Sequence, residues 1–130
     1  MSANRHDSFS IELMSLIQRL SKGVFLVNRH LVPQGYLGIT LWPFVIMKSQ
    51  GSSPRDIRHE RIHLRQQLEM GVLPFYLWYG LEYLIRRLQY ESHYEAYCNI
   101  SFEREAYSMD GEMGYLNHRS FWAWTRFLKK

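Results

Sequence analysis

The chain has 130 residues, 46% of them hydrophobic and 15% aromatic. This composition suits one compact domain with a substantial core and excludes a disordered chain. The formal charge of +4 comes mostly from arginines scattered along the sequence, so we expect no nucleic-acid partner. The single cysteine, Cys98, excludes both an intrachain disulfide and a cysteine-based zinc cluster. We therefore treat residues 1–130 as a single domain.

The N-terminal segment lacks the charged-then-apolar pattern of a secretory signal, which predicts a cytoplasmic protein. Residues 36–47 and 70–85 approach the hydrophobicity of membrane segments. Proline, glycine or glutamate residues interrupt both, and neither supplies the roughly 20 apolar residues that a spanning helix needs. Peripheral contact of residues 70–85 with a membrane surface stays open.

The first predicted elements are a helix and two strands. Apolar residues recur at helical spacing over residues 10–22, and Gly23 is the expected end of that helix. Two extended runs follow, at residues 24–28 and 36–47, separated by a turn-like sequence. They predict a small antiparallel pair, with Pro43 at an edge strand or a bulge.

A helix start is indicated at residues 51–56, where Ser53 can cap, Pro54 suits the first helical position and Asp56 can complete a capping box. This helix is expected to end at Gly71. A second helix should run from about Pro74 to about residue 90. Its first half is apolar all round, which predicts that the helix and its aromatic residues are buried.

Two further helices complete the predicted architecture. Ser92 and Glu95 form another capping-box pair, which predicts a third helix through YEAYCNISFEREAY. A last amphipathic stretch covers residues 117–128. The fold class predicted is α+β and mainly helical, with a small antiparallel β element in the N-terminal third.

The strongest chemical signal is the sequence His59-Glu60-Arg61-Ile62-His63 in the first of these long helices. Residues four apart lie one helical turn apart, so both imidazoles project from one face. Two nitrogens at this spacing can bind one Zn²⁺ at about 2.0–2.1 Å. Glu60, beside the first histidine, can act as a general base toward a water molecule. An ordinary solvated helix with glutamate–arginine pairs is the alternative interpretation.

A third zinc ligand must come from another segment. The candidates are His93, Glu95, Glu103, Glu105, Asp110 and His118. HERIH followed by a later helix reading FEREAY resembles the gluzincin-type HExxH zinc metallopeptidases, of the membrane-linked and BlaR-type kinds. The likeness covers the two motif helices and implies a zincin-like core without the family's transmembrane helices. In that family a Glu-x-x-Ala-Asp sequence supplies the third ligand, and alignment on Ala106 places Glu103 there.

Helical geometry separates Glu103 from its neighbour Glu105. Two residues apart on a helix means about 200° around its axis, so only one of them can face the HExxH helix. We expect Glu103 to lie within about 5 Å of both imidazoles, because ligands of one ion at about 2 Å are close together. Glu105 is expected in an ion pair or a structural hydrogen bond. Tyr107 stands where the family has aspartate, and its hydroxyl is the candidate partner of a ligand histidine.

These observations predict a zinc-dependent metallopeptidase-like hydrolase. His59, His63 and Glu103 would hold Zn²⁺, Glu60 would be the general base, and a peptide or protein would be the substrate. The alternative is a non-catalytic zincin-like module that uses its apolar surface to bind a protein partner or a membrane surface.

Overall fold

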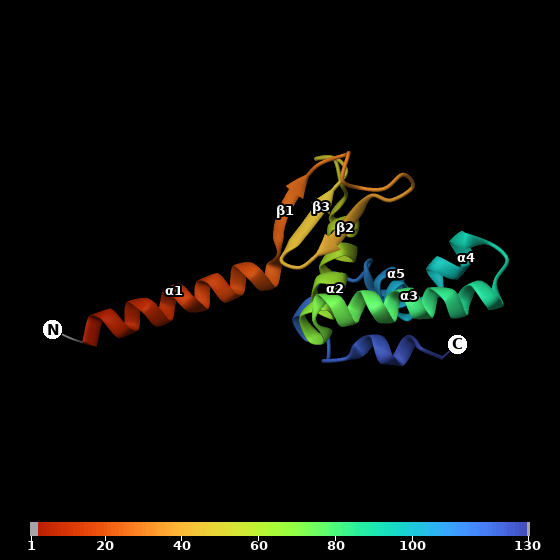
Figure 1. Cartoon of the computed structure of the whole chain (residues 1–130). Coiled ribbons are helices and arrows are strands. Elements are labelled where there is room, and N and C mark those ends of the chain that lie inside the picture. The colour runs from red at the N-terminus through yellow and green to blue at the C-terminus, as the bar shows by residue number, and fades with distance from the viewer. Residues whose placement is uncertain (1–2, 130) are drawn as a thin grey trace.

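The computed structural model describes residues 3–129, with the side chains of the first helix described from Ser8 onward. In chain order the elements are α1 (Ala3–Lys22), β1 (Val24–Val27), β2 (Gly38–Leu41), β3 (Phe44–Met47), α2 (Pro54–Met70), α3 (Val72–Gln89), α4 (His93–Cys98), α5 (Ser101–Met109), α6 (Tyr115–His118) and the 3-10 helix η1 (Ala123–Phe127). The described chain is mainly helical with one small sheet, which confirms the α+β class. Helix α1 projects away from the rest of the molecule (Figure 1).

Helix α1 is longer than predicted and ends where expected. Gly23 has φ 84° and its N–H donates to the carbonyl of Arg19 at 3.0 Å. A Cβ at this position would lie 2.9 Å from Leu64 Cδ2, so the close approach of α2 and the left-handed backbone both require glycine. Most apolar side chains of α1 are exposed, Phe9 and Ile17 among them.

The sheet has the order β1-β3-β2 and mixed pairing. β2 and β3 are antiparallel, whereas β1 pairs in parallel with β3. The predicted antiparallel pairing of the two extended runs is therefore wrong, because the second run alone forms the hairpin. Pro43 lies in the turn between β2 and β3, after a cis peptide bond to Trp42, and not at an edge strand or a bulge. A proline fits there because it has no N–H to donate to a ladder.

Helix α2 begins as predicted and connects the sheet to α5. Ser53 and Asp56 exchange both bonds of the capping box, at 3.1 Å each. On one side of α2, Leu64 packs with Val45 and Met47 of β3. On another side, Ile62 packs against Ala106 of α5. His59 and His63 lie on the part of the α2 surface between these two contacts. This part of the surface therefore faces the space between the sheet and α5.

Helix α3 contradicts the prediction that it is buried. Its inner face belongs to the core, where Phe75 clusters with Ile100, Phe102 and Trp124. Its outer face is exposed and apolar, with large side chains at Leu73, Leu77, Trp78, Leu81, Leu84, Ile85 and Leu88. None of the described helices is long and apolar enough to cross a membrane.

The predicted third helix is two helices, α4 and α5, with a break at Asn99 and Ile100. At this break the carboxylate of Glu82 in α3 accepts from the backbone N–H of Ser101 at 2.9 Å and from its hydroxyl at 2.6 Å. This carboxylate caps the start of α5 from outside the helix. The predicted last helix is also divided, into α6 and η1, on either side of Arg119.

Candidate metal centre

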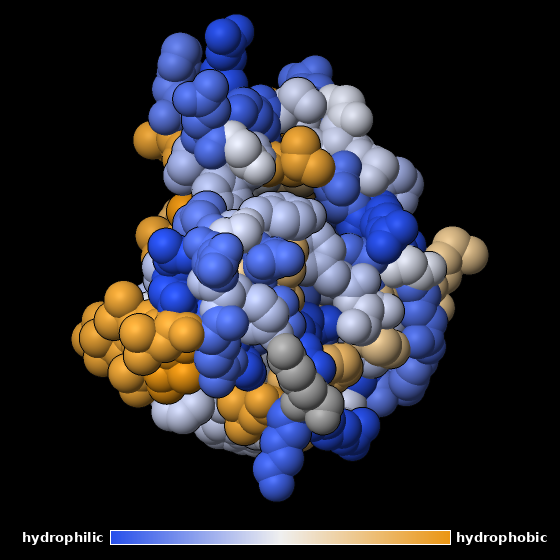
Figure 2. Space-filling model, turned by 90° about the vertical axis from the view of Figure 1, so that its right-hand side faces the viewer, coloured by the Kyte–Doolittle hydropathy of each residue, from blue (hydrophilic) through white to orange (hydrophobic). Residues whose placement is uncertain are grey.

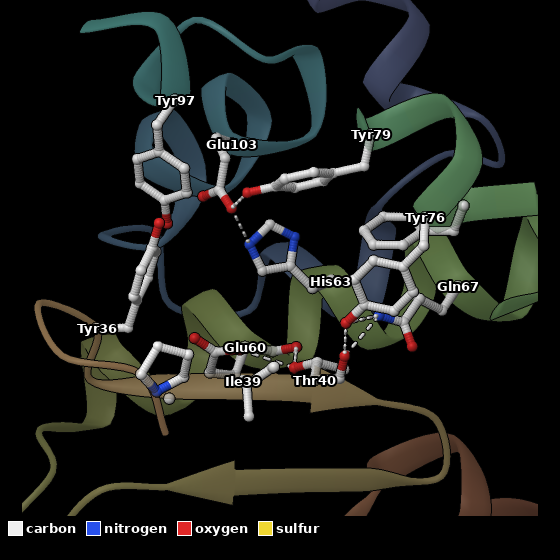
Figure 3. A pocket seen from close by; sticks show the side chains of 13 residues that line it. Tyr36, Ile39, Thr40, Glu60, His63, Gln67, Tyr76, Tyr79, Tyr97 and Glu103 are labelled. Carbon is white, nitrogen blue, oxygen red and sulfur yellow. Dashed lines mark hydrogen bonds and ion pairs between the residues drawn. The ribbon is translucent and has the colours of Figure 1, made fainter. Parts of the chain in front are cut away.

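Three buried side chains from two helices meet between α2 and α5. His59 and His63 come from successive turns of α2, and Glu103 comes from the first turn of α5. The two Nε2 atoms are 3.2 Å apart, and Glu103 lies 3.2 Å from each, through Oε2 to His59 and Oε1 to His63. Figure 3 shows the Glu103 carboxylate pointing at the His63 ring. The predicted proximity of Glu103 to both imidazoles is confirmed.

The far nitrogen of each ring is already engaged by an acceptor. His59 Nδ1 lies 3.1 Å from Asp110 Oδ2, and His63 Nδ1 lies 2.8 Å from Gln66 Oε1. The Gln66 amide is oriented by its own NH₂ group, which donates to the Phe102 carbonyl and to Glu105. Each Nδ1 must therefore carry the proton, which leaves the Nε2 lone pairs directed at each other and at Glu103.

The three side chains are arranged so that they could hold a cation between them. Two imidazole lone pairs and a carboxylate converge without a donor between them, and that is favourable only if a proton or a metal ion lies among them. One ligand atom from each residue lies within 4.8 Å of the others. Tetrahedral zinc with bonds of about 2.0–2.1 Å has donor atoms about 3.3 Å apart. The two Nε2 atoms, 3.2 Å apart, match that spacing, and each lies 3.2 Å from a different oxygen of the Glu103 carboxylate.

Electrostatics couple the three side chains strongly. Burial alone would lower the pKa of His63, but the Glu103 carboxylate outweighs it and raises that pKa to about 9. Burial acts to raise the pKa of Glu103, yet His63 and His59 hold it far below its ordinary range. Without a metal, a proton on His63 therefore fills the central position.

Glu60 lies beside the cluster but is held by the sheet. Its Oε2 accepts from the Thr40 hydroxyl of β2 at 2.7 Å, and it is buried. Strand β2 can come this close because Gly38 has no side chain, since a Cβ there would lie 3.2 Å from Glu60 Cδ. The carboxylate is thus fixed next to the histidines without taking part in their three-way contact.

Tyr107 and Asp110 both contact His59, in different ways. The Tyr107 ring packs edge-on against the His59 ring, with centroids 4.5 Å apart. The carboxylate at His59 Nδ1 belongs to Asp110, one helical turn further along the chain. Arg55 donates to Asp110 Oδ1 at 2.6 Å, and Arg58 donates to its carbonyl. Asp110, and not the predicted Tyr107 hydroxyl, is therefore the partner of the His59 Nδ1 atom.

The other candidate ligands lie outside the three-residue cluster. Glu105 is fully buried and binds Arg119 and the Tyr115 hydroxyl, which confirms its predicted structural role. His93 bonds to the Tyr83 hydroxyl, and His118 pairs with Glu112. The backbone N–H of Glu95 is capped by Ser92.

A cavity of about 250 Å³ opens onto the cluster. Its lining includes Glu60, His63 and Glu103 together with Thr40 and Gly38 of β2. Several aromatic residues complete the wall: Tyr36, Phe75, Tyr76, Tyr79 and Tyr97. They come from the β1–β2 loop, α3 and α4, so Figure 3 shows side chains that are distant in sequence facing one space.

Tyr79 connects this wall to the cluster, since its hydroxyl donates to Glu103 Oε1 at 2.8 Å. Burial and the Glu103 charge raise the pKa of Tyr79, which keeps its phenol protonated as a donor. Sequence reasoning assigned the aromatic residues of this helix to the core, and no local spacing singled out Tyr79. Sequence reasoning also did not single out Thr40 and Gln66. Thr40 contacts Glu60, which lies 20 residues away on another element. Gln66 contacts the His63 Nδ1 atom, which points away from the three-residue cluster.

Comparison of the chain with protein-family models, with curated proteins and with solved structures finds no match.

Proposed function

We propose that this protein is a zinc-dependent hydrolase of the metallopeptidase type, with a small gluzincin-like core. The observation that carries the proposal is the convergence of His59, His63 and Glu103 at 3.2 Å separations beside the buried Glu60. Structural helices rarely bury two imidazoles and two carboxylates together without a function, because isolated buried charges are costly. The resemblance of HERIH and FEREAY to gluzincin motifs points to the same chemistry.

The donor set suits zinc better than the other common divalent metals. Two imidazoles and one carboxylate form a set found in catalytic zinc sites, whereas calcium and magnesium prefer all-oxygen ligands. When bound, zinc would supply a Lewis acid that activates water and polarises a carbonyl group. Asp110 and Gln66 would hold the two rings in the tautomer that presents Nε2, and Tyr79 would orient the Glu103 carboxylate.

Glu60 would serve as the general base. It would accept the proton of the attacking water and return it to the leaving amine. The Thr40 hydroxyl leaves Glu60 Oε1 free for this role while it holds Oε2. The cavity lies on the same side, because Glu60, His63 and Glu103 all line it.

Strand β2 makes a peptide the favoured substrate class. β2 is an edge strand, and Gly38, Ile39 and Thr40 line the cavity, so an extended chain can pair with its free edge. The Gln67 side chain already occupies the far end of that edge, since it donates to the Thr40 carbonyl and accepts from the Trp42 N–H at 2.8 Å each. An added peptide would therefore pair over a short stretch near Gly38.

One observation favours the second candidate function, a non-catalytic module that binds a protein or a membrane. The outer face of α3 is exposed and apolar, which is typical of interaction surfaces. The two candidates differ in whether Glu60 performs chemistry.

Glu60→Gln tests the proposal. The variant should retain zinc, measured by elemental analysis, and lose hydrolysis of a broad peptide mixture by about 10²- to 10⁴-fold, the usual contribution of a general base. Glu91→Gln, at an exposed position, is the matched control and should cleave like the parent. Equal cleavage by Glu60→Gln and the parent would refute the mechanism. Zinc binding without cleavage of any peptide by the parent would favour the module.

A further inference from the structure

Helix α3 carries a continuous apolar surface that nothing in the described chain covers. We define the α3 outer face as Leu73, Leu77, Trp78, Leu81, Leu84, Ile85 and Leu88, whose exposed fractions run from 38% at Trp78 to 90% at Leu88. In Figure 2 hydrophobic side chains gather at the left edge, on the side where α3 lies nearest the viewer in Figure 1. Apolar patches of this extent on a folded protein mark an interaction site.

The apolar surface continues onto the C-terminal segment. Trp124 packs against Trp78 of α3 with ring centroids 6.1 Å apart, and Trp122 packs against Trp124 at 5.6 Å. Trp122 and Phe121 are themselves exposed, Phe121 at 69%. Aromatic residues at the border of an apolar face are typical of the boundary between lipid and water.

The exposed charges around the face are mostly positive. The acidic residue of α3, Glu82, is buried and bound to Arg86 and Ser101. The exposed charged residue of α3 is Arg87, and residues 119–129 add the exposed Arg126 and Lys129 and no carboxylate. The exposed Glu91 follows the C-terminal end of α3, and together with Arg87, Arg126 and Lys129 it leaves a rim of net positive charge. Such a rim around an apolar face is complementary to an anionic lipid surface.

The width of the face distinguishes a lipid surface from a single partner helix. At 100° per residue, the five leucines fall within about 80° of the helix circumference, which alone would suit a two-helix seam. Trp78 and Ile85 on one flank widen the exposed apolar arc to about 140°, and Arg87 borders it on the other side. A partner helix covers a narrow stripe, whereas a planar apolar medium covers a wide face.

We infer that the α3 outer face and the C-terminal aromatic residues dock this protein on an anionic lipid surface. The helix lies on the membrane and does not cross it, in keeping with the absence of a spanning helix from the described residues. Phe75, Tyr76 and Tyr79 of the same helix line the cavity, so docking places the cavity wall within about one helix diameter of the lipid. The inference is independent of whether the cavity is catalytic.

Sedimentation with vesicles tests the inference on the full chain. The parent should pellet with phosphatidylcholine vesicles that contain phosphatidylserine, and more weakly with phosphatidylcholine alone. Leu77→Gln with Leu84→Gln should weaken binding at least about tenfold, because each leucine contributes buried apolar area. Arg87→Gln with Lys129→Gln should reduce binding to the anionic vesicles alone, by roughly fivefold per cation.

The matched control is Phe9→Gln with Ile17→Gln, which changes exposed apolar residues of similar exposure on α1. It should bind vesicles like the parent. Zinc content and circular dichroism establish that each variant is folded, and light scattering after gel filtration gives its mass. The inference is overturned if the parent does not pellet, or if the α1 variant alone loses binding. It is also overturned if the parent is a dimer that ignores vesicles and that Leu77→Gln with Leu84→Gln converts to a monomer.

Discussion

Replacement of Glu103 by glutamine is the sharpest test of the metal centre. The change is nearly isosteric and keeps an oxygen that can accept from Tyr79, whose hydroxyl lies 2.8 Å from Glu103 Oε1. It removes the negative charge that lies 3.2 Å from both imidazoles. If Glu103 is a ligand, Glu103→Gln loses the only anionic donor of the three-residue cluster.

The expected magnitude follows from the position of the carboxylate. Loss of an outer hydrogen-bond partner of a ligand costs about 10- to 100-fold in metal affinity, so loss of a direct donor should cost at least about tenfold, or 1.4 kcal/mol. Zinc at about 100 times the parent's Kd stabilises the fold by about 2.7 kcal/mol, and a tenfold weaker site gains about 1.4 kcal/mol at the same concentration. For a chain of this length, zinc should therefore raise the Tm of Glu103→Gln by about 5 °C less than it raises the Tm of the parent.

Competition against a chromophoric chelator measures the affinity, and thermal unfolding with and without zinc measures the linked stability. Glu105→Gln is the matched control, two residues away on the same helix and equally buried. It should keep zinc affinity within a few-fold, because Gln66 still donates to the Phe102 carbonyl and the new amide oxygen can accept in place of the carboxylate. It should lower the unfolding free energy by about 3 kcal/mol, because Glu105 is paired with Arg119 inside the protein. Unchanged zinc affinity in Glu103→Gln, or an equal loss in Glu105→Gln, would refute the assignment.

Three further predictions concern the groups around the cluster. Asp110→Asn should weaken zinc binding about 10- to 100-fold, because the uncharged amide is a weaker acceptor for the His59 Nδ1 proton. Parental affinity in competition against a chelator would contradict this prediction. In metal-free protein the raised pKa of His63, about 9 against 6.5, stabilises the fold fully below pH 6.5. This stability should be lost as pH rises toward 9, whereas stabilisation by zinc should grow over the same range; urea unfolding with and without chelator measures both slopes. Thr40→Val should leave zinc content unchanged but slow peptide hydrolysis about tenfold, since Glu60 loses its orienting hydroxyl; equal rates would remove Thr40 from the mechanism.

Features that depend on neighbouring residues could be predicted from the sequence. The start of α2 follows from Ser53, Pro54 and Asp56, whose capping box needs only residues three apart. The common orientation of His59 and His63 follows from their spacing of one helical turn. The opposite orientations of Glu103 and Glu105 follow from the same helical period. Local geometry fixes each of these whatever the rest of the chain does.

Features that depend on packing between distant segments could not be predicted in this way. Asp110 is brought to His59 by the fold of α5 against α2, and only the tertiary contact distinguishes it from other acidic residues. Where the predicted third helix divides in two, Ser101 donates to Glu82, a residue 19 positions away that no local pattern connects to it. The parallel pairing of β1 with β3 depends on where the chain returns to the sheet.

The exposure of α3 shows most clearly what the sequence alone determines. Its composition indicates a helix rich in apolar residues, but a buried helix and one that leaves an apolar face exposed have the same local pattern. Only the tertiary structure decides between them, because the inner face of α3 packs on Phe102 and Trp124 while no described element covers the outer face. The sequence by itself determines which residues are available for a zinc site and an apolar face. The packing of α2, α3 and α5 decides which of them meet and which remain exposed, since contacts between elements far apart in the chain depend on the whole fold and not on local spacing.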